Sequence, residues 1–298
     1  MKLVSYHTGD GEPAVGALTE AGIADLGALV PERSGLSPTR TLITTADHAA
    51  IERAVTEAPV LDPASVTLLP PVPDPGKIVA APVNYFDHKH EMSESVHIDS
   101  LGVFLKAPSS LSPPGGTVRL PYHDRRFDQE GELAVVIGRT ASHVPEDRAL
   151  EYVFGYTCLL DMTMRGGEDR STRKSFDTFT PLGPAIVTAD EVGAVADLEL
   201  RCWVNGALRQ RADLKDLIWD VPQLIAYVSS VMELRPGDVI ATGTPAGVGP
   251  VHDGDTVTVE ISRIGRLEVD VSAEGSVVCP TNGANRGPKP PAELTPVR

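Results

Sequence analysis

Short apolar runs separated by glycine, proline and polar residues dominate the chain and predict a fold built mainly from strands. Residues 2–7 and 14–18 have strand patterns, whereas residues 45–57 have the apolar spacing of a helix that Thr44 or Thr45 could cap. Six prolines between residues 59 and 75 disfavour regular ladders and indicate a connector. We therefore expect a small α+β domain with its connector over residues 1–72.

The strongest strand signals lie between residues 77 and 272. Strand-like runs occupy residues 77–81, 103–106, 132–138, 185–187, 198–204, 256–262 and 266–271. Asn205-Gly206 predicts a hairpin turn and Ile264-Gly265 a second turn, while residues 221–232 predict a helix capped by Asp220. These patterns predict an α+β, β-rich main domain over residues 73–273. Residues 274–298 lack periodicity, so they are predicted to be disordered or extended.

Composition and charge exclude several classes of function. The chain has 41 acidic and 26 basic residues and a formal charge of −15, which disfavours partners such as nucleic acid or an anionic membrane. Its first residues do not resemble a signal peptide, and no apolar run approaches the roughly 18–20 residues that span a bilayer. We therefore expect a cytoplasmic protein. Its three cysteines lack metal-site or disulfide spacing and are expected to be inert thiols.

Two acids precede a run that is apolar on both faces. In Glu130-Gly-Glu132-Leu-Ala-Val-Val-Ile, the acids share the face of Ala134 and Val136. Such a run predicts a buried strand, at whose end unpaired carboxylates would be costly. A hard divalent cation such as Mg²⁺ or Mn²⁺ would solve that problem. Alternatively, the strand simply emerges into solvent here.

A third acid follows a second apolar run. Asp161 comes directly after residues 153–160, so three acids at the ends of buried strands are consistent with one metal site. The alternative is that Asp161 is a turn or helix-capping acid.

Other candidate catalytic groups lie on both sides of these acids. His88 and Glu91 are three residues apart, which lets a carboxylate orient an imidazole as a general base if they share a helical turn. Lys174 could stabilise an oxyanion beside the metal. An exposed turn and a surface lysine are the ordinary alternatives. Residues 242–249, which include Gly243 and Thr244, offer backbone N–H groups and hydroxyls to an anion.

Taken in order, these segments resemble the fumarylacetoacetate hydrolase family. The matching segments are residues 84–92, Phe104-x-Lys106, residues 130–138, Asp161, residues 174–184 and residues 235–249. The resemblance covers about residues 75–272. It implies a mixed β-sandwich or β-roll catalytic domain, usually a homodimer, that binds Mg²⁺ or Mn²⁺.

The resemblance also implies individual roles. Positions matching Glu130, Glu132 and Asp161 hold the metal in the family. The segment of His88 and Glu91 corresponds to a mobile lid, Lys174 to the residue facing the reacting atoms, and Thr244 to a group that binds the substrate carboxylate.

The chain departs from the family pattern at two places. The usual Asn-Asp-x-Ser-Ala-Arg-Asp reads Leu-Asp-Met-Thr-Met-Arg-Gly over residues 160–166, which keeps Asp161 and Arg165. The substrate-facing wall therefore differs, and Arg165, Arg170 and Arg173 could bind a second carboxylate or lie on the surface. Val83 replaces the usual glycine before Asn84.

These observations predict a metal-dependent hydrolase that cleaves a carbon–carbon bond in a small 2,4-diketo acid, such as an acylpyruvate or fumarylpyruvate. His88, oriented by Glu91, would activate water, and Lys174 would stabilise or protonate the departing carbanion. The alternative is a decarboxylase or tautomerase of a 2-oxo diacid on the same metal site. A scaffold protein without activity is a third hypothesis.

Overall fold

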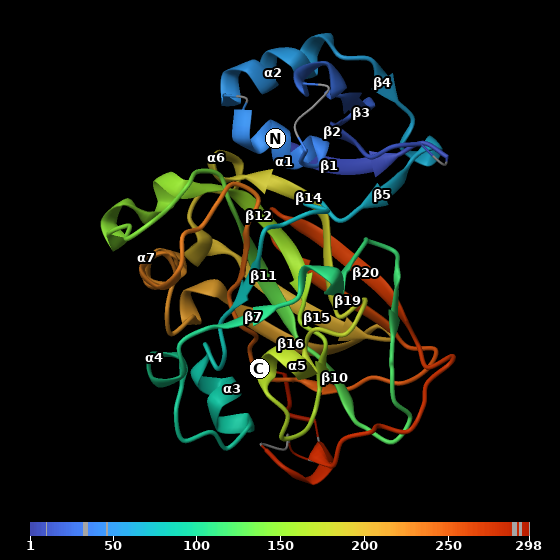
Figure 1. Ribbon diagram of the computed structural model, residues 1–298, viewed down its shortest axis with the longest axis vertical. Coiled ribbons are helices and arrows are strands. Elements are labelled where there is room, and N and C mark those ends of the chain that lie inside the picture. Colours follow the sequence, from blue (N-terminus) through green and yellow to red (C-terminus); the bar gives the residue numbers. More distant parts are fainter. Residues whose placement is uncertain (10, 32–34, 46, 288–290, 292–293, 298) are drawn as a thin grey trace.

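The computed structural model describes residues 1–298 except 10, 32–34, 46, 288–290, 292–293 and 298. Figure 1 shows the N-terminal region stacked on one end of a larger body of strands, with α7 on one flank of that body and α3 and α4 below it. The N-terminal elements are β1 (Lys2–His7), β2 (Ala14–Thr19), β3 (Gly22–Asp25), α1 (Pro38–Thr45), α2 (His48–Glu57), β4 (Val60–Leu61) and β5 (Thr67–Leu69).

The largest sheet runs through both parts of the molecule. Its order is β4-β3-β2-β1-β14-β12-β11-β17-β6-β7, with β5 beside β1 and β8 beside β14. The elements not yet defined are β6 (Ile78–Ala80), β7 (Phe104–Lys106), β8 (Leu111–Ser112), β11 (Gly131–Ile137), β12 (Val153–Leu160), β14 (Thr180–Thr188) and β17 (Val239–Ala241). Because β1 pairs with β14, the sheet of the N-terminal region continues into the main sheet.

Two smaller sheets complete the described part of the fold. The larger of them consists of β16 (Ala207–Asp213), β15 (Glu199–Val204), β19 (Thr256–Ile261), β20 (Gly265–Ser272) and β9 (Thr117–Arg119). The other consists of β13 (Thr163–Met164), β10 (Phe127–Gln129) and β18 (Gly249–Pro250). The remaining α-helices are α3 (Phe86–Glu91), α4 (Ile98–Leu101), α5 (Arg170–Arg173), α6 (Ala189–Val192) and α7 (Val221–Val231).

The main hydrophobic core lies between the largest sheet and the sheet of β15, β19 and β20. Leu133, Val135 and Ile137 of β11 point into this core, where they join residues such as Leu200 and Val259 from the other sheet. All residues of β11 are buried, as the apolar run predicted. The opposite face of β11 carries Glu132 and the alternate apolar residues, so the acids lie outside the sandwich core.

Several local predictions are confirmed. The strand over residues 2–7 and the hairpin between β15 and β16 form as expected, with Asn205 and Gly206 at φ 52° and 76°. Positive φ at both central residues matches the twist of a tight hairpin. The cysteines are buried and unpaired, and burial raises the pKa of Cys158 and Cys202 to about 12, which keeps these thiols protonated.

The predicted helix over residues 45–57 is wrong in its start and its cap. Instead α1 ends at Thr45, and α2 begins at His48 with Asp47 as its cap, whose carboxylate accepts from Ala50 N at 2.6 Å. Thr44 and Thr45 donate back to carbonyl groups of α1, so their hydroxyls are already used. The proline-rich connector also contains two short strands, β4 and β5, between its prolines.

The predicted cap of α7 is confirmed and can be tested. Gln223 N donates to Asp220 Oδ1 at 2.9 Å, and Asp220 N donates to the Gln223 side chain at 3.1 Å. Asp220→Ala should lower the free energy of unfolding by about 1 kcal/mol because it removes one acceptor of this capping box. Asp220→Asn keeps an acceptor and should stay close to the parent in denaturant unfolding. Equal stability of all three proteins would contradict the cap.

Candidate metal centre and catalytic pair

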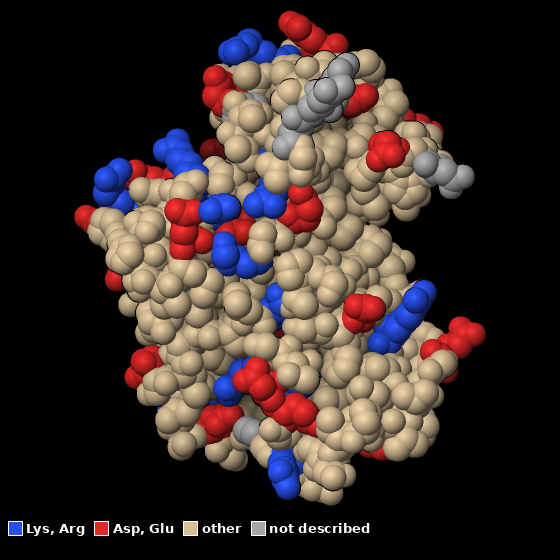
Figure 2. Space-filling model, viewed as in Figure 1, with Lys and Arg blue, Asp and Glu red and all other residues tan. Residues whose placement is uncertain are grey.

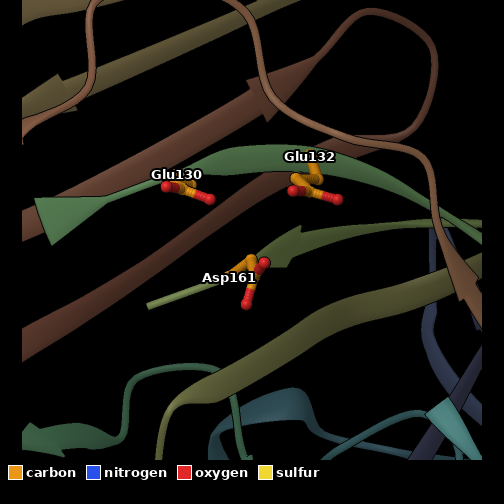
Figure 3. Close-up of side chains that lie close together, drawn as sticks. All are labelled: Glu130, Glu132 and Asp161. Carbon is orange, nitrogen blue, oxygen red and sulfur yellow. The ribbon is translucent and has the colours of Figure 1, made fainter. Parts of the chain in front are cut away.

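The three predicted acids meet at the ends of two paired strands. Glu130 precedes β11 and Glu132 lies within it, while Asp161 follows β12. Antiparallel pairing places Glu132 opposite Leu159, and Asp161 N donates to Glu130 O at 2.8 Å. Ligand oxygens of all three carboxylates lie within 4.8 Å of one another. Figure 3 shows the three side chains gathered at these strand ends. The acids therefore converge on one buried position.

Buried cations surround two of these acids. Glu130 accepts from Arg165 Nη2 and from Lys174 Nζ, each at 2.7 Å. Asp161 accepts from Lys106 Nζ at 2.5 Å and also from Lys174. Burying carboxylates together is possible here because each of these two has cationic partners.

Glu132 is the acid without such a partner. Its carboxylate accepts the backbone N–H of Gly243 at 2.7 Å, and no ion pair joins it to a cation among the described residues. Burial, together with the Asp161 carboxylate, raises the pKa of Glu132 well above its ordinary value. Burial also acts to raise the pKa of Glu130, but Lys174 and Arg165 outweigh it and hold that pKa far below normal.

This charge imbalance fits a divalent cation. Three carboxylates can each offer an oxygen to one position, and oxygen ligands suit Mg²⁺, Mn²⁺ or Ca²⁺. A cation at that position would give Glu132 the positive charge it lacks and would relieve the repulsion between the acids. The donor set of this chain therefore suits a divalent metal.

The loop predicted to bind an anion uses its groups within the protein. The Gly243 N–H serves Glu132, and Thr244 Oγ1 donates to Gly131 O at 2.9 Å while accepting from Gln210 Nε2 at 2.7 Å. Gly243 has φ 95°, and a Cβ there would lie 2.7 Å from Asn84 Cβ, so this position requires glycine. Thr244 lines the cavity described below.

His88 and Glu91 form the predicted pair on one turn of α3. His88 Nδ1 lies 3.0 Å from Glu91 Oε2, and the Glu91 side chain is fully buried. Burial acts to raise the pKa of Glu91, but hydrogen bonds from His88, Thr295 and Gly247 outweigh it and lower this pKa. An ionised Glu91 can only accept, so His88 Nδ1 carries the shared hydrogen, and the other ring nitrogen, Nε2, takes no part in this contact.

One small cavity lies between His88 and two of the acids, Glu130 and Glu132. It is lined by the candidate residues His88, Glu130, Glu132, Arg165, Arg170, Arg173, Lys174 and Thr244, together with Ala81, Pro82, Val83, Met92, Glu94 and Phe104. His88 and the acid cluster therefore face a common space. Val83 holds φ 48°, a conformation that glycine adopts without strain and valine rarely adopts.

The arginines differ in how they are engaged. Arg165 donates to Asp128 and Glu130, each at 2.7 Å, so it holds the acid cluster in place. Arg170 lies 3.8 Å from Glu94. Arg173 is buried, and its Nε has no hydrogen-bond partner among the described residues. Burial and the neighbouring Arg165 lower the pKa of Arg173, an effect that an anion in the cavity would oppose.

Sequence reasoning missed the parts that other residues play at this site. Lys106 is fully buried and binds Asp161, although the sequence motif Phe104-x-Lys106 by itself predicts no role for it. The feature of the sequence that could have indicated this role is a single lysine at the end of an apolar run. Asp128 anchors Arg165, and Gln210 accepts from Gly131 N while donating to Thr244, so the hairpin of β15 and β16 also supports the site.

On the face seen in Figure 2, acidic and basic side chains are interspersed and form no large patch of one charge. In the described part of the chain, no helix combines the length and the apolar character that crossing a bilayer requires.

The packed sheets and the buried carboxylate cluster suit a protein that binds a divalent metal. The family model described as fumarylacetoacetate (FAA) hydrolase C-terminal matches residues 77–272. The chain belongs to this family, which confirms the predicted resemblance and the β-rich α+β fold.

Relatives in this family carry out related chemistry. Maleylpyruvate hydrolase of Aquipseudomonas alcaligenes is 48% identical over 234 residues, covering 75% of this chain and 82% of the relative. A mitochondrial oxaloacetate tautomerase of Xenopus laevis is 34% identical and covers 90% of this chain and 89% of its own length. A crystal structure of maleylpyruvate hydrolase from Sphingobium sp. SYK-6 contains manganese(II) and pyruvate. It is 41% identical, with a TM-score of 0.80, and covers 92% of this chain and 99% of that one.

The lack of a cationic partner for Glu132 leads to a prediction about metal binding. At a Mn²⁺ concentration about a hundred times Kd, the parent protein should gain about 2.7 kcal/mol of stability. Glu132→Gln should lose most of this gain. Without metal it should be at least as stable as the parent, because a neutral amide needs no compensating cation where burial and Asp161 disfavour an ionised carboxylate.

Thermal unfolding with Mn²⁺ and with EDTA checks both parts of this prediction. Glu94→Gln is the matched control, since Glu94 lines the same cavity outside the acid cluster. An undiminished Mn²⁺ effect in Glu132→Gln would exclude Glu132 as a ligand.

Proposed function

We propose that this chain is a divalent-metal-dependent hydrolase that cleaves a carbon–carbon bond in a small 2,4-diketo acid of the acylpyruvate type. The observation that carries the proposal is the shared cavity, where His88, held by buried Glu91, faces the carboxylate cluster. The similarity to maleylpyruvate hydrolases supports this choice of reaction. A scaffold protein would have no need of this arrangement.

Glu130, Glu132 and Asp161 are the proposed metal ligands. Mg²⁺ or Mn²⁺ bound there would act as a Lewis acid toward the 2-oxo acid end of the substrate. Arg165 and Lys106 hold the carboxylates of Glu130 and Asp161 in position, and the Gly243 N–H holds one oxygen of Glu132.

His88 is the proposed general base. Its Nε2 is free to take a proton from water, while Nδ1 stays hydrogen-bonded to Glu91 and the carboxylate stabilises the resulting imidazolium. The activated water attacks the distal carbonyl carbon of the substrate. The bond between that carbon and the neighbouring CH₂ then breaks, and the CH₂ carbon leaves with the electron pair as an enolate that is later protonated to pyruvate.

Lys174 is the proposed group that stabilises or protonates this enolate. All three donors of its ammonium have acceptors in the structure: Glu130, Asp161 and the hydroxyl of Thr163. Lys174 must therefore release one acceptor before it can donate to substrate, a change favoured when the acids share their charge with a cation.

The remaining cations indicate a substrate with a second carboxylate. Arg173 is buried in the cavity wall without an ion-pair partner among the described residues, and Arg165 is already engaged. A distal carboxylate, as in maleylpyruvate or fumarylpyruvate, would supply the missing anion. Thr244 is the proposed contact for the substrate carboxylate next to the metal. The Gly243 N–H does not serve this carboxylate, because it is bound to Glu132.

Tautomerisation of a 2-oxo diacid is the second candidate function. It is favoured by the similarity to the oxaloacetate tautomerase, which extends over 90% of this chain. The same acids and cations would serve that reaction, but water activation by His88 would not be required.

Other expectations from the sequence stay predictions. They are the homodimer, the cytoplasmic location, the mobility of the segment that carries His88, and the division of the chain at residues 72 and 273.

Product analysis tests the proposed function and the role of His88 together. With Mg²⁺, NMR should show pyruvate plus maleate from maleylpyruvate or fumarate from fumarylpyruvate, and EDTA should abolish both.

His88→Ala should lower kcat by about 10²–10⁴-fold, because it removes the general base, and should keep the thermal shift caused by Mn²⁺. Altered oxaloacetate keto–enol exchange without any cleavage would favour the tautomerase instead.

The role of Arg173 can be tested with substrates of different charge. Arg173→Gln should raise KM for fumarylpyruvate roughly 10–100-fold, because a charge-assisted hydrogen bond contributes about 1.5–3 kcal/mol. It should change KM for acetylpyruvate, which has no distal carboxylate, by less than about twofold.

Arg170→Gln is the control, since Arg170 already faces Glu94. An equal loss with both substrates would contradict a distal-carboxylate site at Arg173.

A further inference from the structure

The segment of residues 294–297 reaches the catalytic pair from beyond the part of the chain that matches the family. The match ends at residue 272, yet Thr295 Oγ1 donates to Glu91 Oε1 at 2.6 Å. Glu91 itself lies on α3, 204 positions earlier in the sequence. The region after residue 273 therefore takes part in the surroundings of the proposed general base.

The Glu91 carboxylate divides its two oxygens between two tasks. Oε2 faces His88 Nδ1 at 3.0 Å, whereas Oε1 accepts from Gly247 N at 2.9 Å and from Thr295 Oγ1 at 2.6 Å. A short hydroxyl–carboxylate distance is typical of a charge-assisted hydrogen bond. Because the side chain is fully buried, these donors replace the water that an exposed carboxylate would bind.

The Gly247 donor alone cannot fix the carboxylate. With a single hydrogen bond to Oε1, the carboxylate could still rotate about that contact. The second donor to Oε1, together with His88 on Oε2, defines the plane of the carboxylate. Gly247 cannot be exchanged for another residue, since its φ is 102° and a Cβ would lie 1.8 Å from Arg209 O. Of the two donors to Glu91 Oε1, Thr295 is therefore the one that can be changed by substitution.

Neighbouring contacts hold Thr295 in position. A Cβ at Gly249 would lie 2.5 Å from Leu294 Cδ2, so Leu294 packs closely over this glycine. Pro296 and Val297 line a surface cavity shared with Tyr85 and Phe86 at the start of α3. The segment is thus anchored on both sides of the hydroxyl that reaches Glu91.

The geometry points to Thr295 as a positioning residue, which orients Glu91 and through it the imidazole of His88. This inference rests on the proposed function, because it assigns Thr295 to the activation of water by His88. Without the hydroxyl, Glu91 keeps its charge but loses one of the contacts that aim it, so His88 is held less firmly in the geometry that accepts a proton. The effect should fall on the chemical step rather than on substrate binding.

Two substitutions separate the hydroxyl from the shape of the side chain. Thr295→Val keeps the branched shape and removes the donor, whereas Thr295→Ser keeps the donor and removes a methyl group. Val297→Ala is the packing control, since Val297 lines the neighbouring cavity and forms no hydrogen bond with Glu91. All three are compared with the parent in the full chain, with saturating Mg²⁺.

Thr295→Val should lower kcat by about tenfold or more, up to about a hundredfold, with KM changed by less than about twofold. Thr295→Ser and Val297→Ala should stay close to the parent. Hydrogen exchange measured without substrate should rise in residues 86–92 in Thr295→Val only. A parent-like kcat and parent-like exchange in Thr295→Val would overturn the inference, as would equal losses in Thr295→Val and Thr295→Ser, which would indicate packing.

The exchange measurement also separates this inference from the proposed function. If the parent cleaves no diketo acid, the proposed hydrolase function fails and with it the role of Thr295 in catalysis. Increased exchange in Thr295→Val would then still support the contact that orients Glu91, and unchanged exchange would reject that contact too. If the parent is active, kcat decides the catalytic role.

Discussion

The constraint on which the rest of this structure depends is the burial of like charges. Glu130, Glu132 and Asp161 lie together away from water, where mutual repulsion and lost hydration both oppose ionisation. The protein compensates two of them with Lys106, Lys174 and Arg165, whose own burial is possible only because the acids are there. Carboxylates and cations thus depend on one another, and a divalent cation would complete the balance.

The fold supplies this cluster by strand pairing rather than by a flexible loop. β11 and β12 pair along their length, so the acids at their ends are fixed by backbone hydrogen bonds, and the sandwich core lies on the other face of β11. His88 and Glu91 instead lie on the short helix α3, where Gly247 and Thr295 donate to Glu91. A rigid carboxylate cluster therefore faces a histidine whose position depends on side-chain contacts.

Much of this arrangement could be predicted from local sequence. The alternation around Glu130 and Glu132 indicates a buried strand with acids on one face, and the spacing of His88 and Glu91 indicates one helical turn. The convergence of Asp161 with the other acids depends on strand register, which no local pattern specifies. Lys106 resembles an ordinary strand-end lysine, and Thr295 lies in a region without periodicity, so its partner emerges only from the folded chain.

The pairing of β1 with β14 has a consequence for the N-terminal region as a whole. β14 pairs with β12 on its other side, so β1 covers what would otherwise be an open row of backbone donors and acceptors at the margin of the catalytic sheet. Open margins of this kind recruit strands from other chains and promote aggregation. The N-terminal region carries the sheet onward to the two-residue strand β4, so it leaves only a short edge there and contributes no residue to the cavity.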